Sequence, residues 1–200
     1  MGIFDKKYCA ICGIKIKLFG NRKLSNGNMC KYCENKLSPF FNKRRNSSVS
    51  EIKEQLIYRE SNKEIVSTFN TTQTLNAGDF LFLIDDKINK FMITWSGNEN
   101  PDVIDFSQVT GCSNEVDEWK DEIYREDKKG NQISYYPPRY EYYYKFKIVI
   151  YVNSPWFDEI KLIISEGELK KYNNFEYKEA ERQAEEIRNV FQKKNRRLNY

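Results

Sequence analysis

Two pairs of cysteines with the same spacing lie near the start of the 200-residue chain, Cys9 with Cys12 and Cys30 with Cys33. Two residues separate the members of each pair, and seventeen residues separate the pairs. The thiolates of a Cys-x-x-Cys pair can reach the same ion, and a second pair at this separation completes a tetrahedron of sulfurs. Zinc is the usual occupant of such a site. We therefore predict one zinc ion held by all four cysteines.

Disulfide bonds and a dithiol redox motif are the alternatives to a metal. The chain has five cysteines, and the residues ahead of Cys9 do not resemble a secretory signal peptide. We therefore expect a cytoplasmic protein with reduced thiols, which favours metal binding. A site with four sulfur ligands leaves no position for water or substrate, so we expect the zinc to stabilise the fold rather than take part in a reaction.

Short local elements must bring the two cysteine pairs together. Gly13 follows the first pair and can adopt the left-handed backbone that turns amides toward sulfur. The Asn26-Gly27 pair is typical of a two-residue hairpin turn, and a short helix should run from Cys33 toward Pro39. This order predicts a zinc-ribbon or treble-clef-like module over residues 1–45.

The stretch CAICGIKIKL…NGNMCKYCENKLSP resembles a bacterial family of small four-cysteine zinc-binding domains of unassigned function, over about residues 8–40. In that family the domain often precedes a longer region. The resemblance implies that Cys9, Cys12, Cys30 and Cys33 are the metal ligands and that the protein comes from a bacterium or a phage. It implies no reaction.

The chain contains no histidine, and this excludes several classes of enzyme. Catalytic triads, histidine-assisted cysteine nucleophiles and histidine-ligated catalytic zinc all require an imidazole. The sequence also has no glycine-rich phosphate loop. Carboxylate or tyrosine chemistry stays open, but the acidic residues are scattered, and we expect a protein that is not an enzyme.

Charge is distributed unevenly along the chain. Residues 1–60 carry 13 lysine and arginine residues against 5 aspartate and glutamate residues, whereas residues 61–170 carry 12 against 19. The basic residues can offset the negative charge of a zinc–thiolate cluster, or they can contact the phosphates of a nucleic acid. The acidic middle disfavours anionic lipid head groups as a partner.

The period of apolar residues separates two further parts of the chain. Residues 49–59 have helical spacing, with Ser50 and Glu51 at the start, and predict a linker helix within residues 46–61. From residue 62 the period is two, and residues 80–84 and 91–95 predict a hairpin. Further strands are expected at residues 65–69, 103–109, 140–152 and 160–164. A helix should close the chain, with one apolar stripe of Tyr177, Ala180, Ala184, Ile187 and Phe191.

A run of antiparallel strands followed by one amphipathic helix resembles the pleckstrin-homology-like fold. This resemblance covers residues 62–200 and implies a bent antiparallel β-barrel capped by the C-terminal helix. The whole chain is therefore expected to be α+β, with a zinc module at 1–45, a linker helix at 46–61 and a barrel at 62–200.

Residues 112–140 exceed what a compact barrel needs and predict a long projecting hairpin. Alternate tyrosines such as Tyr142 and Tyr144 should fill the core, and Cys112 should act as a small apolar residue. The aromatic residues left for a partner surface are Trp119, Tyr135, Tyr136 and Tyr143. We therefore predict a non-enzymatic, zinc-stabilised protein-interaction or regulatory module; the alternative is a nucleic-acid-binding protein that uses the basic zinc module.

Overall fold

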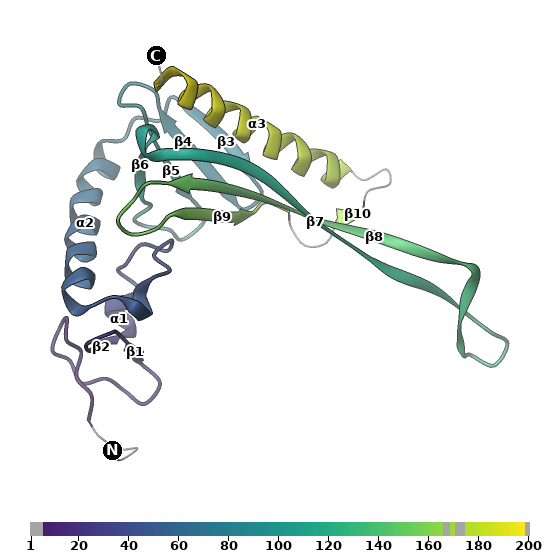
Figure 1. Cartoon of the computed structure of the whole chain (residues 1–200), viewed down its shortest axis with the longest axis horizontal. Coiled ribbons are helices and arrows are strands. Elements are labelled where there is room, and N and C mark those ends of the chain that lie inside the picture. Colours follow the sequence, from purple (N-terminus) through teal and green to yellow (C-terminus); the bar gives the residue numbers. More distant parts are fainter. Residues whose placement is uncertain (1–5, 166–168, 171–174, 199–200) are drawn as a thin grey trace.

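The computed structural model describes residues 6–165, 169–170 and 175–198 (Figure 1). The α-helices are α1 (Lys31–Glu34), α2 (Val49–Thr68) and α3 (Phe175–Leu198), and the 3₁₀-helices are η1 (Arg44–Asn46) and η2 (Phe106–Gln108). The strands are β1 (Asn21–Lys23), β2 (Asn28–Cys30), β3 (Gln73–Ala77), β4 (Phe80–Asp85), β5 (Lys90–Thr94), β6 (Val103–Asp105), β7 (Val109–Glu126), β8 (Gln132–Val152), β9 (Glu159–Ile163) and β10 (Leu169–Lys170). The fold is mixed α and β, as the sequence predicts. No helix in the described part of the chain is both long and apolar enough to cross a membrane.

A small N-terminal core surrounds the cysteine pairs. β1 pairs antiparallel with β2, and α1 follows directly. Leu24 and Met29 are buried beside Cys9 and Cys33, and Ile52 of α2 completes this core. The core thus draws on the first half of α2 as well as on the cysteine-bearing segment.

The hairpin turn of this module lies one residue earlier than predicted. The Leu24 N–H donates to the Gly27 carbonyl at 2.9 Å, so Ser25 and Asn26 form the turn. A Cβ atom on Gly27 would lie 2.8 Å from Cγ2 of Val49. Gly27 therefore permits the close approach of α2, and the turn itself does not depend on it.

The helix α2 begins with a capping box formed by Ser48 and Glu51, not at the predicted Ser50. It also continues to Thr68, so the strand expected at residues 65–69 is wrong. The buried positions of α2 are Ile52, Gln55, Arg59 and Asn62. Because three of these four side chains are polar, the apolar pattern that marks a buried helix face is weak after Ile52.

The second half of α2 is attached to the loop before β6 by a buried polar cluster. The Arg59 guanidinium donates to Asp102 Oδ1 at 2.6 Å, and the Ser38 hydroxyl donates to Asp102 Oδ2 at 2.7 Å. Asn62 donates to the Pro101 carbonyl and accepts from the Val103 N–H. Burial raises the pKa of Asp102, while Arg59 and Ser38 act against this rise.

The strands after α2 form two open antiparallel sheets. The first sheet has the order β3-β4-β5-β6, and it contains the predicted hairpin with Ile84 opposite Phe91. In the second sheet β8 pairs with β7 on one side and with β9 and β10 on the other. No pairing joins the two sheets among the described strands, so the predicted closed barrel is wrong.

The helix α3 packs where strand pairing would join the two sheets in a closed barrel. Phe191 of α3 is fully buried, and its ring lies 4.9 to 5.8 Å from the rings of Phe82, Phe91 and Phe106. The predicted stripe faces the core, since Ala180, Ala184, Ile187 and Phe191 are buried and Tyr177 packs against them. α3 therefore covers the core shared by the two sheets (Figure 1).

The predicted projecting hairpin is present. β7 and β8 run together well beyond the rest of the sheet (Figure 1), and we call residues 117–142 of this ribbon the arm. Tyr144 is 5 % exposed and Tyr142 is 37 % exposed, although both lie on the same face of β8. The prediction that both tyrosines fill the core therefore holds for Tyr144 only, and the arm leaves the core between these two residues.

Candidate metal centre

The four predicted cysteine ligands converge on one point. Their sulfur atoms all lie within 4.8 Å of one another. Cys9 Sγ lies 3.8 Å from Cys33 Sγ, and Cys12 Sγ lies 3.7 Å from Cys30 Sγ. Zinc–sulfur bonds of about 2.3 Å in a tetrahedron place the sulfurs about 3.8 Å apart, whereas a disulfide needs about 2.05 Å. The cluster therefore has the dimensions of a four-thiolate metal site, and all five cysteines are free thiols.

The backbone around the first pair turns as its sequence suggests. Gly13 has a φ of +73°, and its N–H donates to the Cys9 carbonyl at 2.8 Å. The Cys9 N–H in turn donates to the Ile14 carbonyl. These bonds close a tight loop from which both thiols of the first pair reach the sulfurs of the second pair.

Amide groups of the second pair are directed at sulfur. The Cys30 N–H donates to Cys9 Sγ, and the Cys33 N–H donates to Cys30 Sγ, both at 3.4 Å. Such bonds stabilise thiolates, which are the form that binds metal. Cys30 is also the N-cap of α1, so the start of this helix is built around the cluster.

The thiols differ in how readily they ionise. Burial acts to raise the pKa of Cys9, but hydrogen bonds from the backbone of Cys12, Cys30 and Ile11 lower it to about 6. Burial and then the neighbouring sulfurs raise the pKa of Cys33. Four thiolates this close repel one another, so their joint ionisation requires a cation between them. The donor set therefore fits a divalent metal ion.

The site is closed on one side and open on the other. Cys9 and Cys33 are buried, whereas Cys12 is exposed. Glu34 of α1 forms ion pairs with Arg22 of β1 and with Arg44, the latter at 2.9 Å. These pairs hold α1 against β1. The Ala10 N–H, between the cysteines of the first pair, donates to the Asn28 carbonyl of β2 at 2.8 Å, and this bond keeps the first pair beside the second.

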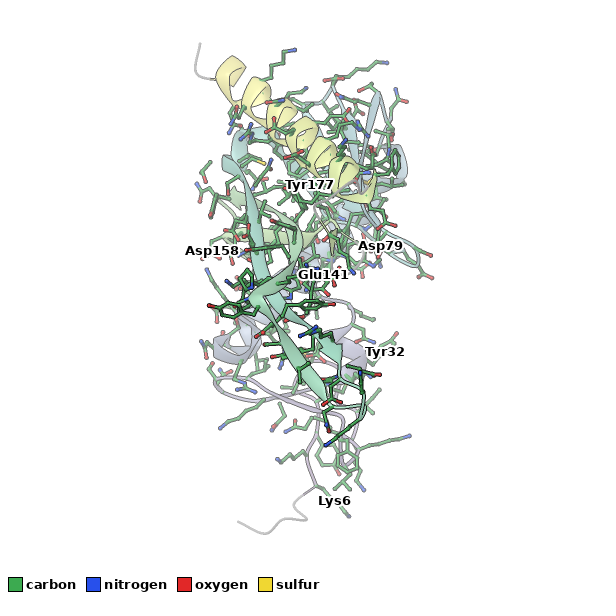
Figure 2. The ribbon with its side chains drawn as sticks, turned by 90° about the vertical axis from the view of Figure 1, so that its right-hand side faces the viewer. Lys6, Tyr32, Asp79, Glu141, Asp158 and Tyr177 are labelled. Atoms are coloured by element: carbon green, nitrogen blue, oxygen red, sulfur yellow. The ribbon has the colours of Figure 1, made fainter. Side chains whose placement is uncertain are left out.

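The predicted partner-binding residues form two groups rather than one. Trp119 and Tyr143 are directly opposite in the β7–β8 register, and their rings stack with centroids 6.0 Å apart. Lys145 lies over the Trp119 ring and Lys170 over the Tyr143 ring. This group lies on the face of the ribbon opposite to the buried Tyr144, near Glu141, which is labelled in Figure 2.

Tyr135 and Tyr136 lie farther along the arm. Ile123 pairs with Arg139 and Tyr124 pairs with Ser134, so residues 135–138 form an irregularity in β8 without ladder partners on β7. The Arg139 guanidinium lies 4.5 Å from the Tyr135 ring centroid, and Tyr136 is fully exposed. Tyr136 is therefore displayed to solvent, whereas Tyr135 is half-buried beside Arg139.

The sequence reasoning missed the polar cluster of Arg59, Asn62 and Asp102. Its only local signal is the helical spacing of Gln55, Arg59 and Asn62 on α2. This spacing resembles a solvated helix face, since polar residues are usually exposed. The partner Asp102 lies 43 residues away from Arg59, which no local pattern can reveal.

Comparison with known proteins gives a match for the N-terminal part. Residues 7–55 match the model of a domain of unknown function (DUF4428). No curated protein and no solved structure matches the chain. No family match supports the pleckstrin-homology-like resemblance of residues 62–200. The matched segment includes all four cysteines and ends within α2, so the part of the chain that carries the four-cysteine cluster is the part similar to this domain of unknown function.

Proposed function

We propose that the four cysteines hold zinc and that the metal serves to fold the N-terminal module. The spacing of the sulfurs supports this proposal, and so does the small size of the core around them, because a core of this size needs a covalent or metal link to be stable. Cysteine would occupy all four coordination positions, so the metal is assigned no reaction. The proposed location is the cytoplasm, where thiols stay reduced.

For residues 62–200 the proposal is a pleckstrin-homology-like arrangement of two open sheets. The support is the order of the elements, with β3 to β6 in one sheet, β7 to β9 in the next, and α3 last. This assignment concerns architecture alone. Function must come from specific surfaces, because one fold supports many functions.

The function proposed for the whole chain is non-enzymatic binding of a protein partner through the arm. The observation that carries this proposal is the fully exposed Tyr136, next to the half-buried Tyr135, on a ribbon outside the core. Arg139 restricts the Tyr135 ring, so little rotamer entropy remains to be lost on binding. Rigid aromatic side chains of this kind are the usual anchors of protein interfaces.

The charge of the arm indicates what kind of protein would fit. Within the arm, β7 has two basic residues, Lys120 and Arg125, and five acidic ones, Asp117, Glu118, Asp121, Glu122 and Glu126. In the described part of the chain, the outer edge of this segment carries no further strand. A partner with a basic surface, able to add a strand to this edge, would match both features.

Photo-crosslinking from the arm tests this function. A photoreactive phenylalanine analogue at Tyr136 should crosslink to one polypeptide in extract of the source cell, and nuclease treatment should not change the product. The same analogue at Ile88, which is 44 % exposed in the β4–β5 turn, is the matched control. Crosslinks of equal pattern from both positions, or nuclease-sensitive products, would reject the arm as the binding surface.

A further inference from the structure

The zinc module displays two adjacent large apolar side chains. Leu18 is 78 % exposed and Phe19 is 88 % exposed, in the turn that precedes β1. The neighbouring Ile16 is buried in the module core. Folding of the module therefore accounts for Ile16 but gives no reason to place Leu18 and Phe19 in water. We call residues 17–20 the apolar tip.

The backbone holds this tip in a defined shape. The Gly20 N–H donates to the Lys17 carbonyl at 2.9 Å, and the Gly20 carbonyl accepts from the Lys31 N–H at 3.1 Å. On the other side, the Ile16 N–H donates to the Lys7 carbonyl at 2.8 Å. The tip is thus tied at both ends to segments that carry the cysteines, so the metal centre fixes its position.

Unpaired lysines lie on both sides of the tip along the chain. The exposed lysines between residues 6 and 31 are Lys6, Lys7, Lys15, Lys17, Lys23 and Lys31. Within residues 6–50 the one acidic residue is Glu34, and it is already bridged by Arg22 and Arg44. No ion pair of these six lysines is found in the part of the chain that the structure describes. The lysines are therefore available to an external anion.

We propose that the apolar tip docks onto an anionic membrane surface. Leu18 and Phe19 would enter the boundary between head groups and acyl chains, while Lys15, Lys17 and their neighbours contact lipid phosphates and carboxylates. A nucleic acid would use the lysines and could stack on Phe19, but it offers no apolar environment for the aliphatic Leu18. A lipid surface accounts for both side chains and for the charge.

The position of the tip makes this docking compatible with the acidic remainder of the chain. The zinc module lies at one end of the molecule, away from α3 (Figure 1), and Lys6 marks that end in Figure 2. The acidic outer part of β7, residues 117–126, belongs to the arm, which projects from the other part of the molecule. The acidic residues of the middle region disfavour lipid when charge is averaged along the sequence. In the structure these residues need not contact the membrane when the tip does.

Vesicle sedimentation of the full-length, zinc-loaded protein tests the proposal. The protein should sediment with phosphatidylcholine vesicles that contain about 30 % phosphatidylserine and should stay in solution with phosphatidylcholine alone. The double variant Leu18→Ser/Phe19→Ser should lower partitioning by roughly tenfold or more, because two inserted apolar side chains are lost. Lys15→Glu/Lys17→Glu should have a similar effect that raised salt reproduces in the parent protein.

Matched variants control for general changes in surface character. Ile57→Ser/Phe175→Ser removes two other exposed apolar side chains, and Lys128→Glu/Lys129→Glu makes the same charge change in the turn of the arm. Both should sediment like the parent, and every variant should retain one metal ion per chain. Equal loss in the control variants, or no sedimentation of the parent protein, would overturn the proposal. So would tighter binding to single-stranded oligothymidine than to vesicles, which would assign the surface to nucleic acid.

Discussion

At the scale of single residues, Asp102 has a larger structural role than its place in a loop suggests. It is fully buried and accepts hydrogen bonds from Arg59 of α2 and from Ser38 of the segment that follows α1. One carboxylate therefore links three parts of the chain: α2, the segment after α1 and the loop before β6. A buried charge of this kind is costly unless its partners are present, so each partner depends on the others.

Removing the carboxylate should be strongly destabilising. We predict that Asp102→Ala lowers the free energy of unfolding by about 3 to 5 kcal/mol, because Arg59 is left buried without a counter-ion. Replacing both partners with apolar residues, as in Arg59→Met/Asp102→Leu, should recover much of this loss. Denaturant unfolding of the zinc-loaded protein measures both effects. The exposed pair Glu60 and Lys63 on the same helix is the control, and Glu60→Ala should change stability little.

The two polar sites differ in how far the sequence could predict them. The cluster of Cys9, Cys12, Cys30 and Cys33 could be predicted from spacing, because a metal site requires strict distances between residues that lie close together in the chain. The contact between Arg59 and Asp102 joins residues that are distant in the chain, and its chemistry resembles that of any surface ion pair. Only the packing of α2 distinguishes a buried pair from an exposed one.

At the scale of secondary-structure elements, the arm is a ribbon with little core of its own. Between residues 121 and 141 no side chain is buried. Short-range bonds hold its end, where the Asp127 carboxylate accepts from the N–H groups of Lys129 and Asn131 at 2.7 and 2.9 Å. The arm therefore contributes surface rather than stability.

Shortening the arm should leave the fold intact. We predict that joining Lys120 directly to Tyr142, which face each other in the ladder, through an Asn-Gly turn changes the free energy of unfolding by less than about 1 kcal/mol. Phe191→Ala in the same assay should cost about 3 to 5 kcal/mol, since Phe191 is fully buried, and this variant shows that the assay is sensitive. A large loss of stability in the shortened protein would mean that the arm is part of the folding unit.

Elements were predictable where the pattern was apolar and local. The alternation along β4, β5 and β8 identified strands, and the stripe on α3 identified a buried helix face. The end of α2 was not predictable, because Ile65 and Val66 are β-branched and favour strands, whereas the helix is anchored at Arg59 and Asn62 by tertiary contacts. The prediction of a closed barrel was wrong for a related reason. Whether the two sheets pair with each other depends on where α3 packs, and this is also a tertiary contact.

At the scale of the whole molecule, the metal should control one core without controlling the other. The small core contains Cys9, Cys33 and Ile52, whereas the large core lies between the two sheets and α3. Structural zinc contributes about 10 to 16 kcal/mol of apparent binding free energy to small modules. Loss of the metal should therefore unfold the small core alone.

Thiol labelling after chelation tests this separation. We predict that a zinc chelator exposes four cysteines to rapid alkylation while Cys112 stays protected, because burial raises the pKa of Cys112 to about 12. Intact-mass measurement counts the modified thiols, and circular dichroism reports the strands of the two sheets. Rapid alkylation of all five thiols, together with loss of the strand signal, would show that the two cores unfold as one.

Because α2 is attached at two places along its length, the angle between these two attachments around the helix axis is fixed. Its first half carries Ile52 into the small core, and its second half carries Arg59 and Asn62 to the loop before β6 (Figure 1). One residue inserted between these halves would rotate one attachment by about 100° and shift it by about 1.5 Å relative to the other, whereas seven would restore the angle after about two turns. The direction in which the apolar tip points relative to the arm is therefore a periodic function of the number of residues in one helix.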